Sequence, residues 1–316
     1  MYSANPVPAR GVRVHWDDLP RTVRDAIELR LGSTVTEAVT QPGGFSPGMA
    51  ARLRLADGRR VFVKAVSEAA NPDTPKMHRR EAGIVSALPA SAPVPRLQWI
   101  YDDAGWVALG YDDVDGRHPG DPWTDSDLEL VTKALQKMAA DLTPSPVQTD
   151  ETAAGALRHG INGWRLALER DEKRLDSWAE KHLARLAELE SRAPGFAAGE
   201  TLLHFDTRAD NLLIAGDRVF VLDWPSARVG PAFVDWVAMA PSVAMQGGPD
   251  PDVFLRRFDL AGVSDEAIDA VACSLAGYFV VRALDPPPPG LPTVRAFQAA
   301  QGVEALRWIR RRTGWA

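Results

Sequence analysis

Residues 202–211 read LLHFDTRADN, and residues 219–224 read VFVLDW. The first stretch has the pattern His-x-Asp-x4-Asn, in which Asp206 precedes Asn211 by five positions. The second is an apolar strand that ends in Asp223. Two apolar runs with a Gly-containing turn between them predict a β-hairpin, and that hairpin would bring the three polar side chains together.

These three side chains are of the types that phosphoryl transfer from a nucleotide requires. A carboxylate must accept or orient the proton of an attacking hydroxyl, and we assign Asp206 to that role. Hard oxygen ligands must hold Mg²⁺ against the nucleotide phosphates, and our candidates are Asn211 and Asp223. An ordinary hairpin with polar ends is the alternative interpretation, but the apolar strand with its terminal Asp favours the functional one.

Two further charged residues stand in apolar surroundings. Lys64 interrupts the apolar strand VFVKAV at residues 61–66, and an unpaired Lys among such neighbours would be costly to bury. Glu81 lies in a predicted helix at residues 76–88, on the face that also carries Met77. The simplest solution is that Lys64 and Glu81 pair with each other, whereas two solvated surface charges are the alternative.

In this order the residues resemble those of the aminoglycoside phosphotransferase family, the small-molecule branch of the protein-kinase-like fold. The resemblance extends from about residue 35 to about residue 236 and rests on Lys64, Glu81, Asp206, Asn211 and Asp223. It implies an α+β, protein-kinase-like two-lobe fold. Residues 1–112 would form an N-terminal nucleotide-binding lobe with an antiparallel sheet and helices, and residues 113–316 a mostly helical C-terminal lobe for catalysis and acceptor binding.

By the same resemblance, the phosphoryl donor would be ATP or GTP, bound with Mg²⁺ between the lobes. Lys64 and Glu81 would hold its α- and β-phosphates. The Gly-rich turn at residues 43–48 would cover the phosphates with its backbone N–H groups, although a hairpin turn explains its glycines equally well. The other predicted nucleotide contacts are Gly44, Phe45 and Ser46 in this turn, and the Asp112 carbonyl and the Val114 amide between the lobes.

The catalytic loop departs from the family pattern at Phe205 and at residues 207–210, where TRAD replaces the frequent Leu-His-Pro-Gly. Phe205 stands where the family usually has a small residue, commonly Gly. Arg208 follows Asp206 by two positions, where protein kinases carry a basic residue that contacts the transferred phosphate, so Arg208 would supply a second cation there. A surface Arg on a polar loop is an equal alternative. Asp235 matches a family Asp that braces the catalytic loop, and we assign it a structural role.

Hydrophobic periodicity and turn signals predict the elements of both lobes. In the first lobe we expect a helix at residues 21–31 and strands at 35–40, 50–55, 61–66, 96–101 and 106–111. In the second lobe we expect helices at 125–142, 155–171, 172–192, 234–245, 253–260, 265–284 and 294–312. Four consecutive prolines at 286–289 predict a stiff extended connector between the last two helices.

Composition agrees with a globular enzyme. The 316 residues are 45% hydrophobic and 25% charged, and the net charge of −6 with a pI near 5.6 gives no support for nucleic-acid binding. No apolar run reaches membrane-spanning length, and residues 1–14 lack the apolar core of a signal peptide, so we expect a cytoplasmic protein with no membrane partner. Cys273 is the single cysteine, which leaves no internal disulfide and predicts a buried structural thiol.

The sequence is least informative about the acceptor. Acids that could line its site are Asp121, Asp125, Asp127, Asp250, Asp252 and Asp285, although a helix N-cap or a solvated loop charge is the stronger explanation for each. We expect an ATP- or GTP-dependent O-phosphotransferase, active as a monomer or weak homodimer. Its leading acceptor would be an aminoglycoside or another hydroxylated antibiotic, in resistance or self-protection. A metabolic kinase for a sugar, amino alcohol or nucleoside is the alternative, and a pseudokinase scaffold is disfavoured by the intact catalytic set.

Overall fold

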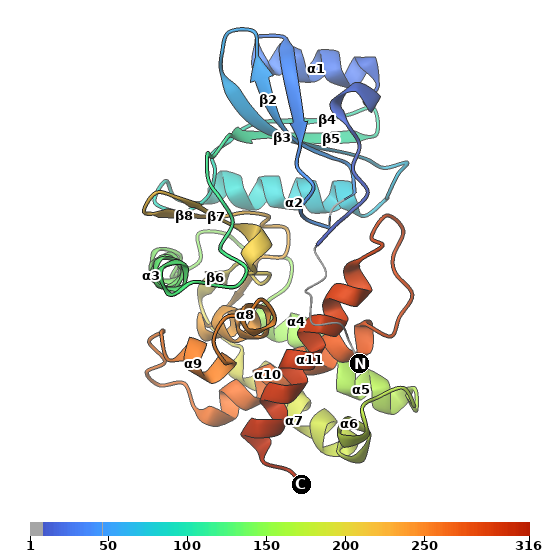
Figure 1. Cartoon of the computed structure of the whole chain (residues 1–316), viewed down its shortest axis with the longest axis vertical. Helices are drawn as coiled ribbons and strands as arrows, with labels where there is room; N and C mark the ends of the chain where they lie inside the picture. The colour runs from blue at the N-terminus through green and yellow to red at the C-terminus, as the bar shows by residue number, and fades with distance from the viewer. Residues whose placement is uncertain (1–8, 46) are drawn as a thin grey trace.

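The computed structural model describes residues 9–45 and 47–316, which fold into two lobes (Figure 1). The first lobe contains a five-stranded antiparallel sheet in the order β1-β2-β3-β5-β4. Its strands are β1 (Val35–Thr40), β2 (Met49–Leu55), β3 (Arg60–Ser67), β4 (Leu97–Asp103) and β5 (Trp106–Asp112). The α+β two-lobe fold expected from the sequence is confirmed, while the lobe boundary between residues 112 and 113 stays a prediction.

Different helices cover the two faces of this sheet. α1 (Arg21–Leu31) packs on one face, where Ile27 shares a buried apolar cluster with Val63 of β3. Because side chains alternate along a strand, Lys64 points to the opposite face, toward α2 (Thr74–Ala87). Figure 1 shows α2 lying between the sheet and the second lobe. The charged side chain that interrupts the apolar strand is thereby placed in the space between the lobes.

α2 buries a slightly different stripe from the one expected. Glu81 is only 3% exposed and His78 is also buried, whereas Met77 is 42% exposed. The expectation that Met77 shares the buried face of Glu81 is therefore wrong. The buried stripe of α2 instead runs from His78 through Glu81 to Val85.

The second lobe is mostly helical. Its helices are α3 (Asp125–Asp141), α4 (Ala153–His159), α5 (Gly163–Glu169), α6 (Ser177–Lys181), α7 (Leu183–Phe196), α8 (Phe233–Met245), α9 (Pro251–Leu255), α10 (Asp265–Arg282) and α11 (Val294–Thr313). Its strands are β6 (Thr201–Leu203), β7 (Leu212–Ala215), β8 (Arg218–Val221) and β9 (Arg228–Gly230), which pair as β6-β9 and β7-β8. Short 3-10 helices are η1 (Trp16–Asp18) in the first lobe and η2 (Ala209–Asn211) in the second. The predicted hairpin is β7-β8, and it holds the catalytic stretch at the edge of the lobe.

Two of the expected long helices are each divided. In place of one helix at residues 155–171, α4 and α5 form a bend, because α5 begins at Gly163 directly against α10. A Cβ atom on Gly163 would lie 2.0 Å from the carbonyl oxygen of Gly277, so the two helices approach each other through glycines. In place of one helix at 172–192, α6 begins anew after Asp176, whose carboxylate accepts a hydrogen bond from the Trp178 amide at 2.9 Å.

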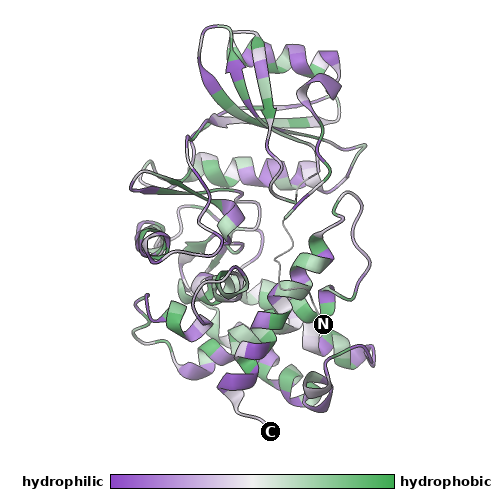
Figure 2. Cartoon of the chain, viewed as in Figure 1, coloured by the Kyte–Doolittle hydropathy of each residue, from purple (hydrophilic) through white to green (hydrophobic). Residues whose placement is uncertain are grey.

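The core of the second lobe is centred on α10, which contacts α5, α7, α8 and α11. Cys273 of α10 is fully buried, as expected for a structural thiol, and its carbonyl oxygen accepts a hydrogen bond from Trp164 Nε1 at 2.8 Å. Hydrophilic residues gather on the outer, C-terminal turns of α11 (Figure 2). α9 ends at Leu255 and is shorter than expected. Within the described ranges, no helix is long and apolar enough to cross a bilayer.

A second connection joins the lobes through the N-terminal segment. The loop between α10 and α11 rises beside the first lobe (Figure 1), and there the Val12 amide donates to the Gly290 carbonyl at 3.1 Å. The same segment runs alongside the Gly-rich turn, where the Gly11 amide donates to the Gly44 carbonyl at 2.9 Å. The Gly-rich turn is therefore tied to the second lobe as well as to its own sheet.

Candidate functional site

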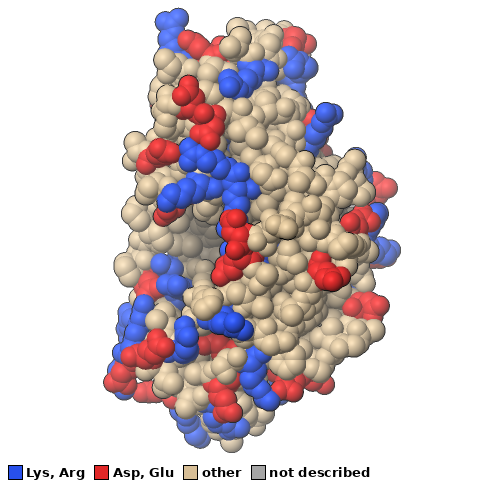
Figure 3. Space-filling view, turned by 180° about the vertical axis from the view of Figure 1, so that it is seen from behind, with Lys and Arg blue, Asp and Glu red and all other residues tan. Residues whose placement is uncertain are grey.

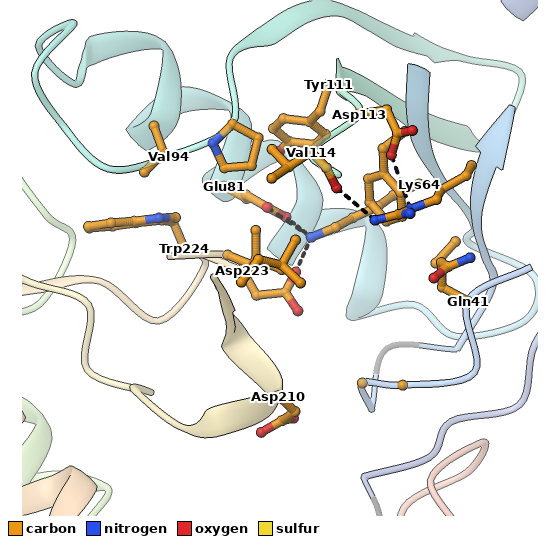
Figure 4. Close-up of a pocket in the computed structure, with 18 of the residues that line it drawn as sticks. Gln41, Lys64, Glu81, Val94, Tyr111, Asp113, Val114, Asp210, Asp223 and Trp224 are labelled. Atoms are coloured by element: carbon orange, nitrogen blue, oxygen red, sulfur yellow. Dashed lines mark hydrogen bonds and ion pairs between the residues drawn. The ribbon is translucent and has the colours of Figure 1, made fainter. Parts of the chain in front are cut away.

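A cavity of about 380 Å³ lies between the lobes (Figure 4). It is lined by the Gly-rich turn, β3, α2, the stretch that follows β5, and the chain just after β8. Val94, Tyr111 and Trp224 supply apolar walls, and charged side chains gather where Lys64 and Asp223 meet. An apolar chamber with a few convergent polar groups is typical of a small-ligand site.

Lys64 stands between two carboxylates in this cavity. Its Nζ atom lies 3.0 Å from Oε1 and 3.3 Å from Oε2 of Glu81, and it also forms an ion pair with Asp223. Burial alone would lower the pKa of Lys64, but the charges of Asp223 and Glu81 outweigh it and raise that pKa. Burial raises the pKa of Glu81, which Lys64 opposes. The expected pairing of Lys64 with Glu81 is present in the structure.

Asp235 on α8 fixes the catalytic loop through hydrogen bonds to its backbone. The amide of His204 donates to Asp235 Oδ2 at 2.7 Å, and the amide of Phe205 donates to Oδ1 at 2.8 Å. Phe205 needs this support because its φ of 65° lies in the left-handed region, where non-glycine residues are strained. The His204 ring packs edge-on against Trp224 at 4.9 Å and hydrogen-bonds through Nε2 to the Leu222 carbonyl at 2.7 Å. The structural role expected for Asp235 agrees with this geometry.

Asp206 lies next in the loop, with 37% of its side chain exposed. Burial raises the pKa of Asp206 to about 6, while the neighbouring Arg208 opposes that rise. The side chain of Asn211 donates through Nδ2 to the Asp206 carbonyl oxygen at 2.8 Å and lies 3.3 Å from its Oδ2. A partly exposed carboxylate that is ionised near neutral pH has the properties of a general base.

Arg208 is mostly buried, so the surface-residue alternative does not describe it. Its side chain is only 14% exposed, forms an ion pair with Asp206, and contacts Asp210 at 3.0 Å through Nη2 and Nε. These carboxylates raise the pKa of Arg208 against the effect of burial. Arg208 therefore holds a fixed positive charge beside Asp206.

The Gly-rich turn is placed as expected only in part. Gly43 and Gly44 line the cavity, whereas Phe45 does not; its ring packs edge-on against Phe297 of α11, with centroids 5.2 Å apart. The Phe45 ring therefore packs on the second lobe, and the contact of its backbone with the nucleotide stays a prediction. Ser46 lies outside the described residues. Gly48 is required for close packing, since a Cβ atom there would lie 2.6 Å from the Ala65 carbonyl oxygen.

The stretch between the lobes follows β5 and also lines the cavity. Asp112 and Val114 are both among its lining residues, which places the two predicted adenine contacts beside the cavity. Between them, the buried Asp113 side chain contacts Arg52 at 3.1 Å and Arg60 at 2.9 Å. These two ion pairs fix the connecting stretch to β2 and β3.

Two lining residues carried no role in the sequence interpretation. His78 of α2 hydrogen-bonds through Nδ1 to the Thr74 carbonyl at 3.1 Å, and burial lowers its pKa to about 4, so its ring is neutral. The position of His78, about one helical turn before Glu81, is the sequence signal that could have identified it as a lining residue. Arg13 reaches the Gly-rich turn from the N-terminal segment, with Nη2 3.2 Å from the Gly44 carbonyl oxygen. No local motif marks Arg13, because only the fold brings that segment to the cavity.

The predicted metal ligands lie near each other. The Leu222 amide donates to the Asn211 carbonyl at 2.8 Å, which sets Asn211 beside the chain that leads into Asp223. Because the Asn211 amide nitrogen faces Asp206, its side-chain oxygen remains for another partner. An amide oxygen and a carboxylate suit Mg²⁺. Within the described chain, no group of three or more His, Cys, Asp or Glu side chains is arranged to hold a metal.

The chain matches the family model of the "Phosphotransferase enzyme family" over residues 43–273. It belongs to this family and is a small-molecule kinase. No curated protein matches it in sequence.

Solved structures share its fold at low sequence identity. A thermostable aminoglycoside phosphotransferase APH(4)-Ia with ADP and hygromycin B has a TM-score of 0.63 and 14% identity, over 93% of this chain and 100% of that one. The GDP and kanamycin complex of an APH(2″) enzyme has a TM-score of 0.59 and 14% identity, over 93% and 99%. A type I macrolide 2′-phosphotransferase has a TM-score of 0.58 and 19% identity, over 93% and 98%.

Proposed function

We propose that this kinase transfers the γ-phosphoryl group of ATP or GTP to a hydroxyl of a small-molecule antibiotic. The observation that carries the proposal is the position of Lys64 between Glu81 and Asp223, in a cavity adjoining the catalytic loop. Lys64, Glu81 and Asp223 together carry a net charge of −1, so Lys64 would pair with nucleotide phosphates once Asp223 pairs with another cation, which the Mg²⁺ bound with the nucleotide would supply.

Each residue of the set receives a role. Lys64, oriented by Glu81, contacts the nucleotide phosphates, and Asp206 takes the proton from the acceptor hydroxyl as it attacks phosphorus. Arg208 would offset negative charge near the transferred group. In the structure, Arg208 forms an ion pair with Asp206. Asn211 and Asp223 would hold Mg²⁺, which neutralises phosphate charge when it is bound.

The nucleotide contacts follow from the cavity lining. Gly44, Asp112 and Val114 all line the cavity, which supports a role for Gly44 over the phosphates and for the Asp112 carbonyl and the Val114 amide at the base edge. The ATP and GTP alternatives stay open, since backbone contacts at Asp112 and Val114 can serve either base. The cytoplasm, which supplies both nucleotides, is the proposed location, and a monomer or weak homodimer the proposed state.

The acceptor class is supported by the kind of molecules bound or modified by proteins of the same fold. Complexes with hygromycin B and kanamycin, and the name of the macrolide enzyme, point to hydroxylated antibiotics. A resistance or self-protection role would follow from such an activity. A kinase for sugars, amino alcohols or nucleosides is tested by the same assay.

A coupled screen for ADP or GDP release, run with ATP and with GTP over aminoglycosides, macrolides, nucleosides and common sugars, tests the proposal. We expect at least one antibiotic to release ADP or GDP with the wild-type enzyme, and mass spectrometry to find a single added phosphate on it. The Asp206→Asn variant is the matched control, because it preserves the size of the side chain and removes the base. Phosphorylation of metabolites alone would replace the antibiotic by a metabolic acceptor, and no transfer to any compound would overturn the proposal.

A further inference from the structure

The N-terminal segment at residues 11–14 lies along the Gly-rich turn. The Val14 amide donates to the Gly48 carbonyl at 3.1 Å, and the Gly48 amide donates to the Val12 carbonyl at 3.0 Å. Arg13 stands between these two anchored residues and forms a parallel β-bridge with Gly48. The backbone of Arg13 is therefore fixed beside the turn, and its side chain is one of those that line the cavity between the lobes.

Backbone carbonyls at the turn orient the Arg13 guanidinium. Its Nε donates to the Gln41 carbonyl at 3.1 Å, and its Nη2 donates to the carbonyls of Gly43 and Gly44. These three acceptors line the same cavity as Asp223 (Figure 4). The three bonds go to neutral oxygens, so they set the direction of the side chain without cancelling its charge. An arginine side chain keeps its proton in proteins, and a positive charge therefore stands at this wall of the cavity.

The cations of the cavity have different places. Among the described lining residues, the Arg and Lys side chains are those of Arg13, Arg52 and Lys64. Arg52 pairs with Asp113 at 3.1 Å and donates to the Val114 carbonyl at 2.7 Å, which places its charge beside the stretch between the lobes. Figure 3 shows basic and acidic side chains together around the hollow on the rear face, with neither sign covering it alone. On that face a polyphosphate would meet no broad positive surface, so its attraction would depend on cations inside the cavity.

Lys64 by itself does not make its end of the cavity positive. Together with Glu81 and Asp223 it forms a group with a net charge of −1. The single positive charge of Arg13 brings that sum to zero before any metal is bound. Burial lowers the pKa of Arg13 and the charge of Asp223 opposes that change, in keeping with their places on one cavity. A nucleotide with anionic phosphates would therefore find a second cation here besides Lys64.

We propose that Arg13 is a nucleotide-binding residue whose guanidinium contacts the phosphate tail of the donor. The inference rests on the proposed phosphotransferase function and adds the N-terminal segment to its nucleotide site. A phosphate oxygen is a stronger acceptor for a guanidinium than a carbonyl oxygen is, because both partners of that hydrogen bond are charged. The phosphates would therefore draw the guanidinium from one or more carbonyls of the turn, while the backbone on either side of Arg13 stays anchored at Gly48.

Binding of a phosphate series tests this contact. Displacement of a fluorescent nucleotide, with Mg²⁺ present, gives the Kd of the nucleoside, the diphosphate and the β,γ-imido triphosphate of adenine and of guanine. For the base that the wild-type enzyme prefers, Arg13→Gln should raise the Kd of the imido triphosphate at least about tenfold, as expected for loss of a charge-assisted contact, and leave the Kd of the nucleoside within about twofold. An equal loss for nucleoside and triphosphate would indicate a general distortion of the site and overturn the inference.

Arg10→Gln is the matched control for this series. Arg10 is exposed in the same N-terminal segment, and its backbone N–H and carbonyl bond to the Thr293 hydroxyl. The substitution removes the same charge from the segment without removing a cavity-lining residue. We expect the Kd of every member of the series to stay within about twofold of wild type, as for a solvated charge. If Arg10→Gln weakens triphosphate binding as much as Arg13→Gln does, the effect belongs to the charge of the segment and the inference is overturned.

Arg13→Lys separates a phosphate contact from a role in fastening the turn. Lysine keeps the charge but lacks the planar fork that reaches several carbonyls together. We expect Arg13→Lys to bind the imido triphosphate at least about threefold more tightly than Arg13→Gln, and its Kd to rise more steeply with salt, because a charge contact is retained. Equal losses in both variants would assign Arg13 to the turn alone and overturn the inference. If the wild-type enzyme binds neither imido triphosphate, the proposed phosphotransferase function fails as well.

Discussion

Lys64 and Glu81 form a buried ion pair between the sheet and α2, with Nζ 3.0 Å from Oε1. Their side chains are 13% and 4% exposed, so neither charge is solvated on its own. Strand alternation sends Lys64 toward the cleft, and the buried stripe of α2 brings Glu81 to meet it. The pair joins two separate elements of the first lobe, and Lys64 extends the link to Asp223 of the second.

The first prediction is that Lys64 and Glu81 act as a unit. Lys64→Ala and Glu81→Ala should each lower kcat/KM by roughly 10²-fold, because each leaves the other charge buried and misplaced. The double variant should fall within about threefold of the worse single variant, as expected for coupled residues. A double-mutant cycle on kcat/KM measures this. Arg79→Ala removes an exposed ion pair of the same helix and is the control. Additive losses would show that the two residues work independently.

The second prediction concerns the ionisation of Asp206. Since burial raises its pKa to about 6, the carboxylate that accepts a proton is depleted as pH falls below that value. We expect kcat/KM to fall about tenfold per pH unit on the acid side of the profile. Asp206→Asn should lower kcat by roughly 10²-fold or more and leave nucleotide affinity near wild type. Near-normal turnover in this variant would remove Asp206 as the base.

The variant Arg208→Gln tests the assignment of Asp206 as the base through a shift of the pH profile of kcat/KM. The charge of Arg208 lowers the pKa of Asp206 and so opposes the effect of burial. Without that charge, the pKa should rise, and the acid limb of the profile should move to higher pH. A limb that stays in place would show that another group controls it.

The sequence was most informative where local physics decides the structure. α1 occupies the predicted residues 21–31 because Gly32 ends it with a φ of 66°. β3 contains the predicted strand at residues 61–66, and the hairpin β7-β8 follows its predicted runs. In each case the signal and the structure involve neighbouring residues, so no tertiary information was needed.

Features that depend on distant contacts were missed. The bend between α4 and α5 follows from the approach of Gly163 to Gly277, which no local pattern reveals. The packing of the Phe45 ring on Phe297 arises because the loop before α11 reaches the first lobe, and the assignment of Phe45 to the nucleotide stays a prediction. The environment of Asp206 likewise depends on α11, because its partner Arg208 lies 5.5 Å from the ring centroid of Phe297. The sequence therefore predicts specific residues for nucleotide binding but leaves the acceptor-binding residues undetermined.

The third prediction concerns the metal. Asp223 has a φ of 61°, an unusual conformation for a non-glycine residue, and its carboxylate meets Lys64 at the end of the cavity. Asp223→Ala should abolish phosphoryl transfer with Mg²⁺ and nucleotide, because Mg²⁺ tolerates little loss from its octahedral shell. EDTA should abolish wild-type activity, and added Mg²⁺ should restore it. Full activity in EDTA would contradict both ligand assignments.

The last prediction concerns Asp235, which is 6% exposed and accepts hydrogen bonds from the backbone amides of His204 and Phe205. Asp235→Ala would leave two buried N–H groups without an acceptor, at about 1–3 kcal/mol each, and would release a strained Phe205 from its support. We expect a loss of about 2–4 kcal/mol in the free energy of unfolding, measured by urea denaturation, together with reduced kcat. Asp235→Asn keeps one carbonyl oxygen and should lose less. Asp217→Ala, at an exposed position in the β7-β8 turn, is the control and should change stability by less than about 0.5 kcal/mol. If Asp235→Ala unfolds at the same urea concentration as the control, the loop does not depend on this carboxylate, and the geometry of Asp206 must be fixed by its contacts with Arg208 and Asn211 instead.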